Sequence, residues 1–279
     1  MPELPEVETV KETLNKLVTD KTIGHVDVRW PNIIQRPDDI KAFQMLLEGQ
    51  TIDTIARRGK FLLFYLDDYV LVSHLRMEGK YRLEEQDTPI DKHTHVIFRF
   101  SDGTELRYRD VRKFGTMHLF NKGEEFNSSP LRQLGPEPLS DVFTSEYLYS
   151  KCQKTERTIK QVLLDQTIVV GLGNIYVDEA LFCARLHPLT KAKHLSAADS
   201  ERLYASIQET LREAVGLGGS TIRTYLNSQG EMGMFQQRLN VYGRQGDSCP
   251  NCGTPIEKIK AGGRGTHFCP VCQNRGDGK

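Results

Sequence analysis

Cys249-Pro-Asn-Cys252 and Cys269-Pro-Val-Cys272 form two CxxC pairs near the end of the chain, spaced C-x2-C-x16-C-x2-C. In a chain without a secretion signal, this spacing favours a site in which all four thiolates bind one zinc ion. Redox-active pairs or spare thiols are the alternatives, and His267 could replace one cysteine as a ligand. Because four thiolates complete the coordination of zinc, the predicted site is structural rather than catalytic.

The residues around these cysteines predict a small basic finger. Residues 240–279 are too few to build a core of their own, so a metal would have to stabilise their fold. Between the pairs, Arg264 lies among glycines, where a loop tip can reach a phosphate; a solvated turn is equally compatible. Residues 220–279 hold eight basic and four acidic residues, a net of +4, although the whole chain has a net charge of +0. Any argument for a nucleic-acid partner must therefore rest on local charge.

Helical periodicity precedes the finger. A stretch rich in proline and glycine at 134–139 indicates a linker, and a glycine turn at 171–174 opens one of the helices. Such a turn offers backbone N–H groups to a phosphate, although most such turns only join packed helices. Three apolar faces carry the helical signal: Ile159, Val162 and Leu163; Val177, Ala180, Leu181 and Ala184; and Leu203, Ile207, Leu211 and Val215.

The first half of the chain reads as one helix followed by a β-structure. Apolar residues at helical spacing predict a helix over residues 6–17. Short β-branched and aromatic runs separated by turns then suggest an antiparallel sandwich or barrel. These runs are 61–66, 69–75, 96–100, 105–108 and 116–120. We thus expect an α+β multidomain protein, with domains 1–134 and 153–239, a linker 135–152 and the finger 240–279.

Composition narrows the class of protein. With 279 residues, 38% of them hydrophobic, the chain can bury a substantial core. No stretch approaches the roughly 18 apolar residues of a membrane helix, and MPELPEVE lacks the pattern of a signal peptide. We expect a cytoplasmic protein with no membrane partner.

Two places carry candidate chemistry. Pro2 follows the initiator methionine, and removal of Met1 would expose a secondary amine able to attack an electrophilic carbon, with Glu3 and Glu6 nearby to move protons. Proline and glutamate also simply stabilise the start of a helix. Further on, Met77, Arg112 and Phe114 are the kind of apolar and cationic side chains that pry a base out of a duplex, although such residues are more often core.

Six motifs together resemble the bacterial formamidopyrimidine-DNA glycosylase family. They occur in family order and span the chain: residues 2–8, 58–61, 74–79, 112–115, 171–176 and the four cysteines. The resemblance implies an N-terminal helix with an antiparallel β-sandwich, a helix–two-turn–helix domain and a C-terminal β-hairpin zinc finger with one structural zinc ion. It also implies a monomeric repair enzyme that acts on double-stranded DNA. Such an enzyme excises oxidised purines, including 8-oxoguanine and formamidopyrimidines, and cleaves the abasic strand by β,δ-elimination.

The resemblance carries roles to individual residues. Pro2 matches the nucleophile that forms a Schiff base, Glu3 the general acid, and Lys60 a catalytic lysine beside the phosphate next to the lesion. Met77, Arg112 and Phe114 match the side chains that fill the gap and face the orphaned cytosine. The phosphate contacts match His74, Asn174, Tyr242, Lys258 and Arg264. The lesion-recognition residues match Glu78, Ser220, Thr221, Ile222, Arg223, Thr224 and Tyr225, and the zinc ligands match Cys249, Cys252, Cys269 and Cys272.

Two rival functions remain open at this point. An endonuclease VIII-like enzyme would prefer oxidised pyrimidines, but Leu4 resembles the purine enzyme, whereas the relative usually has glycine there. A zinc protein that only binds DNA would need neither a free Pro2 amine nor Glu3. Covalent trapping on an abasic site separates this second alternative from an enzyme.

Overall fold

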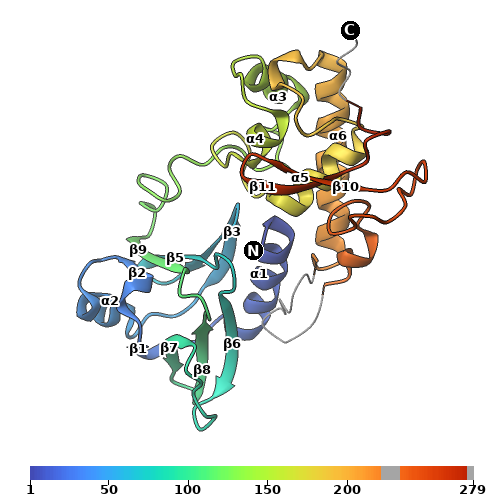
Figure 1. The fold of residues 1–279 in the computed structure, drawn as a ribbon. Coiled ribbons are helices and arrows are strands. Elements are labelled where there is room, and N and C mark those ends of the chain that lie inside the picture. Colours follow the sequence, from blue (N-terminus) through green and yellow to red (C-terminus); the bar gives the residue numbers. More distant parts are fainter. Residues whose placement is uncertain (221–232, 275–279) are drawn as a thin grey trace. The chain divides into compact units, whose positions relative to one another are not determined.

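The computed structural model describes residues 1–220 and 233–274, and these form two compact units. The first unit comprises Met1–Gln133 and the described residues between Gly218 and Met234. The second comprises Leu134–Leu217 and the described residues from Phe235 onward. Figure 1 labels the elements of both units.

The first unit packs helix α1 (Leu4–Val18) and two sheets around one core. The sheets have the strand orders β1-β7-β8-β6 and β2-β9-β5-β4-β3. All neighbouring strands are antiparallel except β2 and β9. The strands are β1 (Ile23–Val28), β2 (Ile34–Arg36), β3 (Thr54–Arg58), β4 (Phe61–Tyr65), β5 (Tyr69–His74), β6 (Lys80–Glu85), β7 (Thr94–Phe100), β8 (Thr104–Arg109) and β9 (Thr116–Asn121). The predicted helix with an antiparallel β-sandwich is confirmed.

The core explains why these residues form these elements. Val7, Val10 and Leu14 are fully or almost fully buried and form the apolar face of α1. They share one cluster with side chains from both sheets, such as Phe64 on β4 and Phe98 on β7. The helix begins two residues earlier than predicted, because a proline at its first turn is compatible with helix geometry. A short helix, α2 (Ile40–Leu47), buries Phe43 and Leu47 against the same core.

The second unit is helical and ends in a β-hairpin. Its helices are α3 (Ser145–Cys152), α4 (Ile159–Leu164), α5 (Asn174–Cys183) and α6 (Ala197–Gly216), and the hairpin pairs β10 (Glu257–Ala261) with β11 (Arg264–Phe268). Ser196 caps α6 by accepting the Asp199 N–H, and Asp199 accepts the Ser196 N–H in return. The predicted helical domain and hairpin finger are confirmed. Among the described residues, no helix is both long and apolar enough to cross a membrane.

Candidate active site and metal centre

The start of α1 is buried and joined to a distant segment by one carboxylate. Pro2, Glu3 and Glu6 are all buried. Oε2 of Glu6 accepts the Glu3 N–H at 2.8 Å, while its Oε1 accepts the N–H of Ser220 at 2.7 Å and its hydroxyl at 3.1 Å. Gly219 has a φ of +77° and lies so close to Glu6 that a Cβ would meet Oε1 at 2.7 Å. Of the predicted lesion-recognition loop, Ser220 is thus anchored beside Glu3, and Thr221, Ile222, Arg223, Thr224 and Tyr225 lie outside the described residues.

Lys60 reaches the same region from the tip of a tight hairpin. Arg58 pairs with Phe61, so Gly59 and Lys60 are the two turn residues between β3 and β4. Gly59 has a φ of +58°, as expected for glycine at the first central position of a two-residue hairpin turn. Lys60 is only 6% exposed. The turn therefore fixes the position of a buried ammonium group.

Burial and several charged side chains determine the pKa of the N-terminal amine. Burial lowers the pKa of the Met1 amine below its ordinary value of 8.0. The charges of Glu3, Glu6 and Glu78 oppose this change, whereas Lys60 adds to it. The predicted residues Glu3, Lys60 and Glu78 thus all act electrostatically on the amine of Met1, the residue before Pro2. Glu78 itself is exposed.

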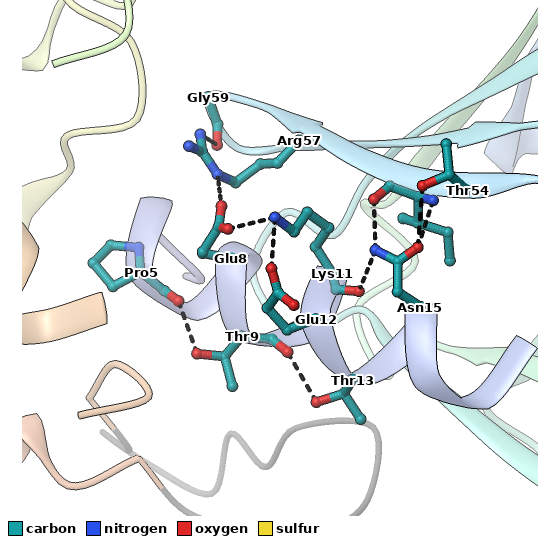
Figure 2. Close-up of polar contacts among 11 residues, drawn as sticks. Pro5, Glu8, Thr9, Lys11, Glu12, Thr13, Asn15, Thr54, Arg57 and Gly59 are labelled. Atoms are coloured by element: carbon teal, nitrogen blue, oxygen red, sulfur yellow. Dashed lines mark hydrogen bonds and ion pairs between the residues drawn. The ribbon is translucent and has the colours of Figure 1, made fainter. Parts of the chain in front are cut away.

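Polar contacts attach α1 to the strand that leads to the Lys60 turn (Figure 2). Glu8 accepts a hydrogen bond from Nε of Arg57 at 2.6 Å and from Nζ of Lys11 at 2.5 Å. Arg57 also donates to the Gly59 carbonyl at 3.0 Å. Two helical turns further along, the Asn15 side chain donates to the Ile55 carbonyl and accepts the Ile55 N–H. These bonds fix the helix that carries Glu3 relative to the hairpin that carries Lys60.

His74 ends strand β5 as a neutral imidazole. Its Nδ1 accepts the Arg76 N–H at 2.9 Å, so Nε2 carries the proton and is the donor of the ring. Burial lowers the pKa of His74 to about 3, and the charges of Arg76 and Lys60 contribute to this shift. The ring packs edge-on against Phe61 with 4.5 Å between centroids. The predicted phosphate ligand is therefore a fixed, uncharged N–H donor.

The three predicted gap-filling side chains lie on two exposed loops, not in the core. Met77 is 37% and Phe114 is 52% exposed, and Arg112 is also exposed. The Arg112 guanidinium lies 4.7 Å from the centre of the Phe114 ring. The alternative prediction that Met77 and Phe114 are core residues is therefore wrong, since neither side chain is buried.

Asp110, which the sequence analysis missed, organises the loop of Arg112 and Phe114. Its carboxylate accepts the N–H groups of Arg112 at 3.0 Å, Phe114 at 2.9 Å and Gly115 at 2.8 Å. Asp110 is 1% exposed, and its carbonyl oxygen lies 2.8 Å from Nε2 of His95. An aspartate two residues before an exposed arginine was the available signal, since short acidic side chains often bond to nearby backbone N–H groups.

The four cysteines form the metal centre in the second unit. Their sulfur atoms all lie within 4.8 Å of one another, with 3.8 Å between Cys249 and Cys272 and 3.5 Å between Cys252 and Cys269. Four thiolates at about 2.3 Å from a tetrahedral zinc ion are roughly 3.8 Å apart, so this group fits one structural zinc. His267, the alternative ligand, instead lies against Asp178.

Two adjacent acids of α5 hold the finger, and the sequence analysis missed both. Asp178 accepts the Lys160 ammonium at 2.7 Å and the His267 N–H at 2.9 Å, while Lys160 also donates to the Thr266 hydroxyl at 2.6 Å. All of these groups are buried. Glu179 accepts the N–H groups of residues 240, 241 and 242 at 2.8 to 2.9 Å. The finger is therefore docked on α5 through buried polar contacts, which are separate from its metal-binding cysteines.

The predicted phosphate ligands of the second unit surround this docking site. Tyr242 packs edge-on against His267 with 5.0 Å between ring centroids. Asn174, the first residue of α5, donates to the Gly265 carbonyl at 2.9 Å. Gly262 and Gly263 form the hairpin turn with φ values of +57° and +76°, and Arg264 follows directly. Arg264 and Lys258 are exposed. These four predicted residues thus all belong to α5 or to the finger segment.

Comparisons with known proteins agree with this architecture. Three family models match: the formamidopyrimidine-DNA glycosylase N-terminal domain over residues 1–117, its H2TH domain over 134–226, and the zinc finger found in FPG and IleRS over 246–275. A formamidopyrimidine-DNA glycosylase of Bacillus licheniformis is 63% identical over 99% of this chain and 100% of its own length. One from Halalkalibacterium halodurans is 63% identical over 98% and 100%.

Solved structures give the same result. The Lactococcus lactis Fpg in complex with DNA containing an abasic site superposes with a TM-score of 0.91 at 44% identity, covering 98% of this chain and 99% of that one. A variant of the same protein with Fapy-dG DNA has a TM-score of 0.93 at 44% identity, covering 98% and 100%. This chain belongs to the formamidopyrimidine-DNA glycosylase family.

Proposed function

We propose that this protein excises oxidised purines, such as 8-oxoguanine and formamidopyrimidines, from duplex DNA and then cleaves the abasic strand by β,δ-elimination. The observation that carries the proposal is the start of α1, where Pro2 and Glu3 are buried and where the charges of Glu3 and Lys60 act on the N-terminal amine. Relatives whose structures hold abasic-site and Fapy-dG DNA support the choice of substrate.

The chemistry begins with removal of Met1, which leaves the secondary amine of Pro2 as the N-terminus. The buried surroundings that lower the pKa of the Met1 amine also favour an unprotonated amine at Pro2. This amine attacks C1′ of the damaged nucleotide, the C1′–N bond to the base breaks, and Glu3 supplies a proton as the sugar ring opens.

Strand cleavage follows from the covalent linkage. The positive iminium acidifies the C2′ proton, so loss of that proton expels the 3′ phosphate, and a second elimination expels the 5′ phosphate. We assign Lys60 to the phosphate beside the lesion, since it is buried at the hairpin tip and its charge acts on the N-terminal amine.

The other proposed DNA contacts fall into groups according to the chemistry of their side chains. Lys258 and Arg264 are exposed cations suited to phosphate oxygens, and His74 offers a neutral N–H donor. Met77, Arg112 and Phe114 fill the gap that the flipped nucleotide leaves, and Arg112 faces the orphaned cytosine. We assign the remaining phosphate contacts to Asn174 and Tyr242, and lesion recognition to Glu78 and residues 220–225.

The organisation of the molecule completes the proposal. One zinc ion holds the finger, and the protein acts as a monomer in the cytoplasm, on the nucleoid. We propose the domain boundaries expected from sequence: a catalytic domain 1–134, a linker 135–152, a helix–two-turn–helix domain 153–239 and the finger 240–279.

Borohydride trapping tests the central step. We expect reduction to join the protein covalently to a duplex that contains 8-oxoguanine opposite cytosine. The matched control is the same chain with an uncleaved N-terminal tag, which leaves every side chain in place but converts the Pro2 amine into an amide. Trapping of the tagged protein at the same yield would contradict the proposal. Duplexes with an oxidised pyrimidine form a second arm, and faster excision from them would support the endonuclease VIII-like alternative.

A further inference from the structure

Two glycines end the two exposed loops of the first unit, and the same side chain lies against both. Gly79 follows Met77 and Glu78 and leads into β6, while Gly115 follows Arg112 to Phe114 and leads into β9. A Cβ at Gly115 would lie 1.6 Å from Oη of Tyr108, and a Cβ at Gly79 would lie 2.3 Å from the same atom. Contacts this short leave no room for any side chain other than hydrogen.

Space, rather than backbone conformation, requires glycine at these two positions. Neither Gly79 nor Gly115 has a positive φ, so alanine could adopt both backbone conformations. At Gly115, the three nearest atoms all belong to Tyr108, at 1.6, 2.6 and 3.2 Å from the Cβ position. At Gly79 the Leu75 carbonyl is also close, at 2.6 Å. The atoms nearest to the Cβ position of Gly115 therefore all belong to Tyr108.

Tyr108 is itself held rigidly. It is fully buried on β8, between Tyr81 of β6 and Val96 of β7. Its ring lies edge-on to that of Tyr81 with 5.1 Å between centroids, and Tyr81 in turn packs on Phe64 with 5.3 Å between centroids. The hydroxyl therefore projects from a fixed aromatic row to the ends of both loops.

We propose that Tyr108 is a positioning residue that sets the spacing between the loop of Met77 and the loop of Arg112 and Phe114. This inference rests on the proposed function, because it is there that the two loops must enter one gap in the duplex together. Because the two loops must enter one gap, a small displacement of either loop is harmful. Misplacement by about an ångström can cost up to about a hundredfold in rate.

The test compares three variants with the wild-type full-length protein. Tyr108→Phe removes the hydroxyl that lies between the loops, and Gly115→Ala pushes one loop away from it. Tyr81→Phe is the matched control, since it also removes a buried hydroxyl from the same row, one that donates to Ser73 and is not among the atoms nearest to either glycine. Each protein is assayed for excision of 8-oxoguanine opposite cytosine and opposite adenine. A 2-aminopurine next to the orphaned cytosine reports whether the loops unstack the duplex.

We expect Tyr108→Phe to reduce the preference for cytosine over adenine by about threefold, and Gly115→Ala by about tenfold, with weaker 2-aminopurine fluorescence. Affinity for undamaged duplex and borohydride trapping on a preformed abasic site should change less than about twofold, because neither needs base discrimination. Combining Gly115→Ala with Tyr108→Leu should recover part of the preference, since leucine lacks all three clashing atoms.

Two results would overturn the inference. One is an unchanged cytosine preference in both Tyr108→Phe and Gly115→Ala, measured well below the melting temperature of each variant. The other is an equal loss in Tyr81→Phe, or a uniform fall in every readout, because either would indicate a general effect on stability. Failure of the wild-type protein to excise 8-oxoguanine would instead overturn the proposed function.

Discussion

At the scale of single residues, His74 allows a prediction about pH. Its folded-state pKa of about 3 lies below the ordinary value of 6.5, so the folded protein keeps the ring neutral while the unfolded chain protonates it. Its contribution to stability is complete above pH 6.5 and is lost as the pH falls toward 3. We expect nitrogen NMR to show a neutral ring with the proton on Nε2 throughout the range from about pH 5 to 8. A titration of His74 near its ordinary pKa would contradict the geometry.

Substitutions of Arg264 and Arg112 test two different kinds of DNA contact, one to the phosphate backbone and one to a base. We expect Arg264→Ala to weaken binding to all duplexes alike. It should also reduce the slope of log affinity against log salt by about one, because binding then neutralises one phosphate fewer and releases fewer counterions. Arg112→Ala should instead change the ratio of excision opposite cytosine and opposite adenine. Both variants are measured on both duplexes at fixed salt. An equal change of this ratio in the two variants would refute the division.

The sequence indicated some residues of the site and not others. Pro2 and Glu3 were predicted from the chemistry of the N-terminus as well as from the family resemblance, whereas Lys60 and Glu78 came from the resemblance alone. The charges of Glu3, Lys60 and Glu78 all act on the N-terminal amine. Asp178 and Glu179 were missed because their partners are backbone N–H groups or side chains that only the folded chain brings near. The partners of Asp110 instead lie within five residues of it, so its role could have been predicted. The two acids of α5 do leave a signal, namely a charged pair inside an otherwise apolar run at 175–182.

At the scale of elements, sequence patterns identified the central strands and missed the edges. The five predicted runs correspond to β4, β5, β7, β8 and β9, each of which has a neighbour on both sides. The missed strands β1, β2, β3 and β6 are the edges of the two sheets. Edge strands carry charged residues that discourage pairing with other chains, as in the sequence Lys-Tyr-Arg-Leu-Glu-Glu of β6. That protection also removes the hydrophobic signal on which strand prediction depends.

The attachment of α1 to β3 predicts a pH-dependent effect of one ion pair. Burial alone would raise the pKa of Glu8, but hydrogen bonds and charge from Lys11 and Arg57 outweigh it and lower the pKa below 4.5. The stabilisation is therefore present above pH 4.5 and is lost as the pH falls further. We expect Glu8→Gln to reduce the free energy of unfolding by about 1 kcal/mol at neutral pH, and by less in acid.

Urea denaturation at neutral and acid pH measures this effect. Glu12→Gln is the control, because Glu12 also pairs with Lys11 but is 59% exposed. Its loss should change stability by less than about 0.5 kcal/mol. Equal effects of the two variants, or an effect of Glu8→Gln that grows as the pH falls, would show that the pair does not attach the helix in the way described.

At the scale of the whole molecule, zinc should matter unequally to the two units. Metal removal should unfold the finger and expose α5, since Cys249 and Cys269 belong to the cluster that also contains Phe182 and Val241. The core of the first unit contains none of these residues. After chelation, we expect hydrogen exchange to accelerate in 240–274 and α5 but not in β4 and β5, with loss of duplex binding.

Single substitutions should reproduce the effect of chelation. Cys249→Ser and Cys272→Ser should behave like the chelated protein, whereas Cys183→Ser should not, because Cys183 lies outside the metal-binding group. Hydrogen exchange that chelation leaves unchanged in every segment, or full affinity of the chelated protein for lesion DNA, would show that the finger folds and acts without its metal.

The anchoring of Ser220 by Glu6 also has a consequence for biosynthesis. The ribosome must make the whole stretch from Leu134 to Leu217 before Ser220, which donates to Glu6 near the start of α1, emerges. At about 5–20 residues per second, that delay lasts roughly 4 to 17 seconds. During this interval Oε1 of Glu6 lacks both of its hydrogen bonds from Ser220. The polar contacts at the start of α1 are therefore completed only after residues 134–217, which belong to the other unit, have been synthesised.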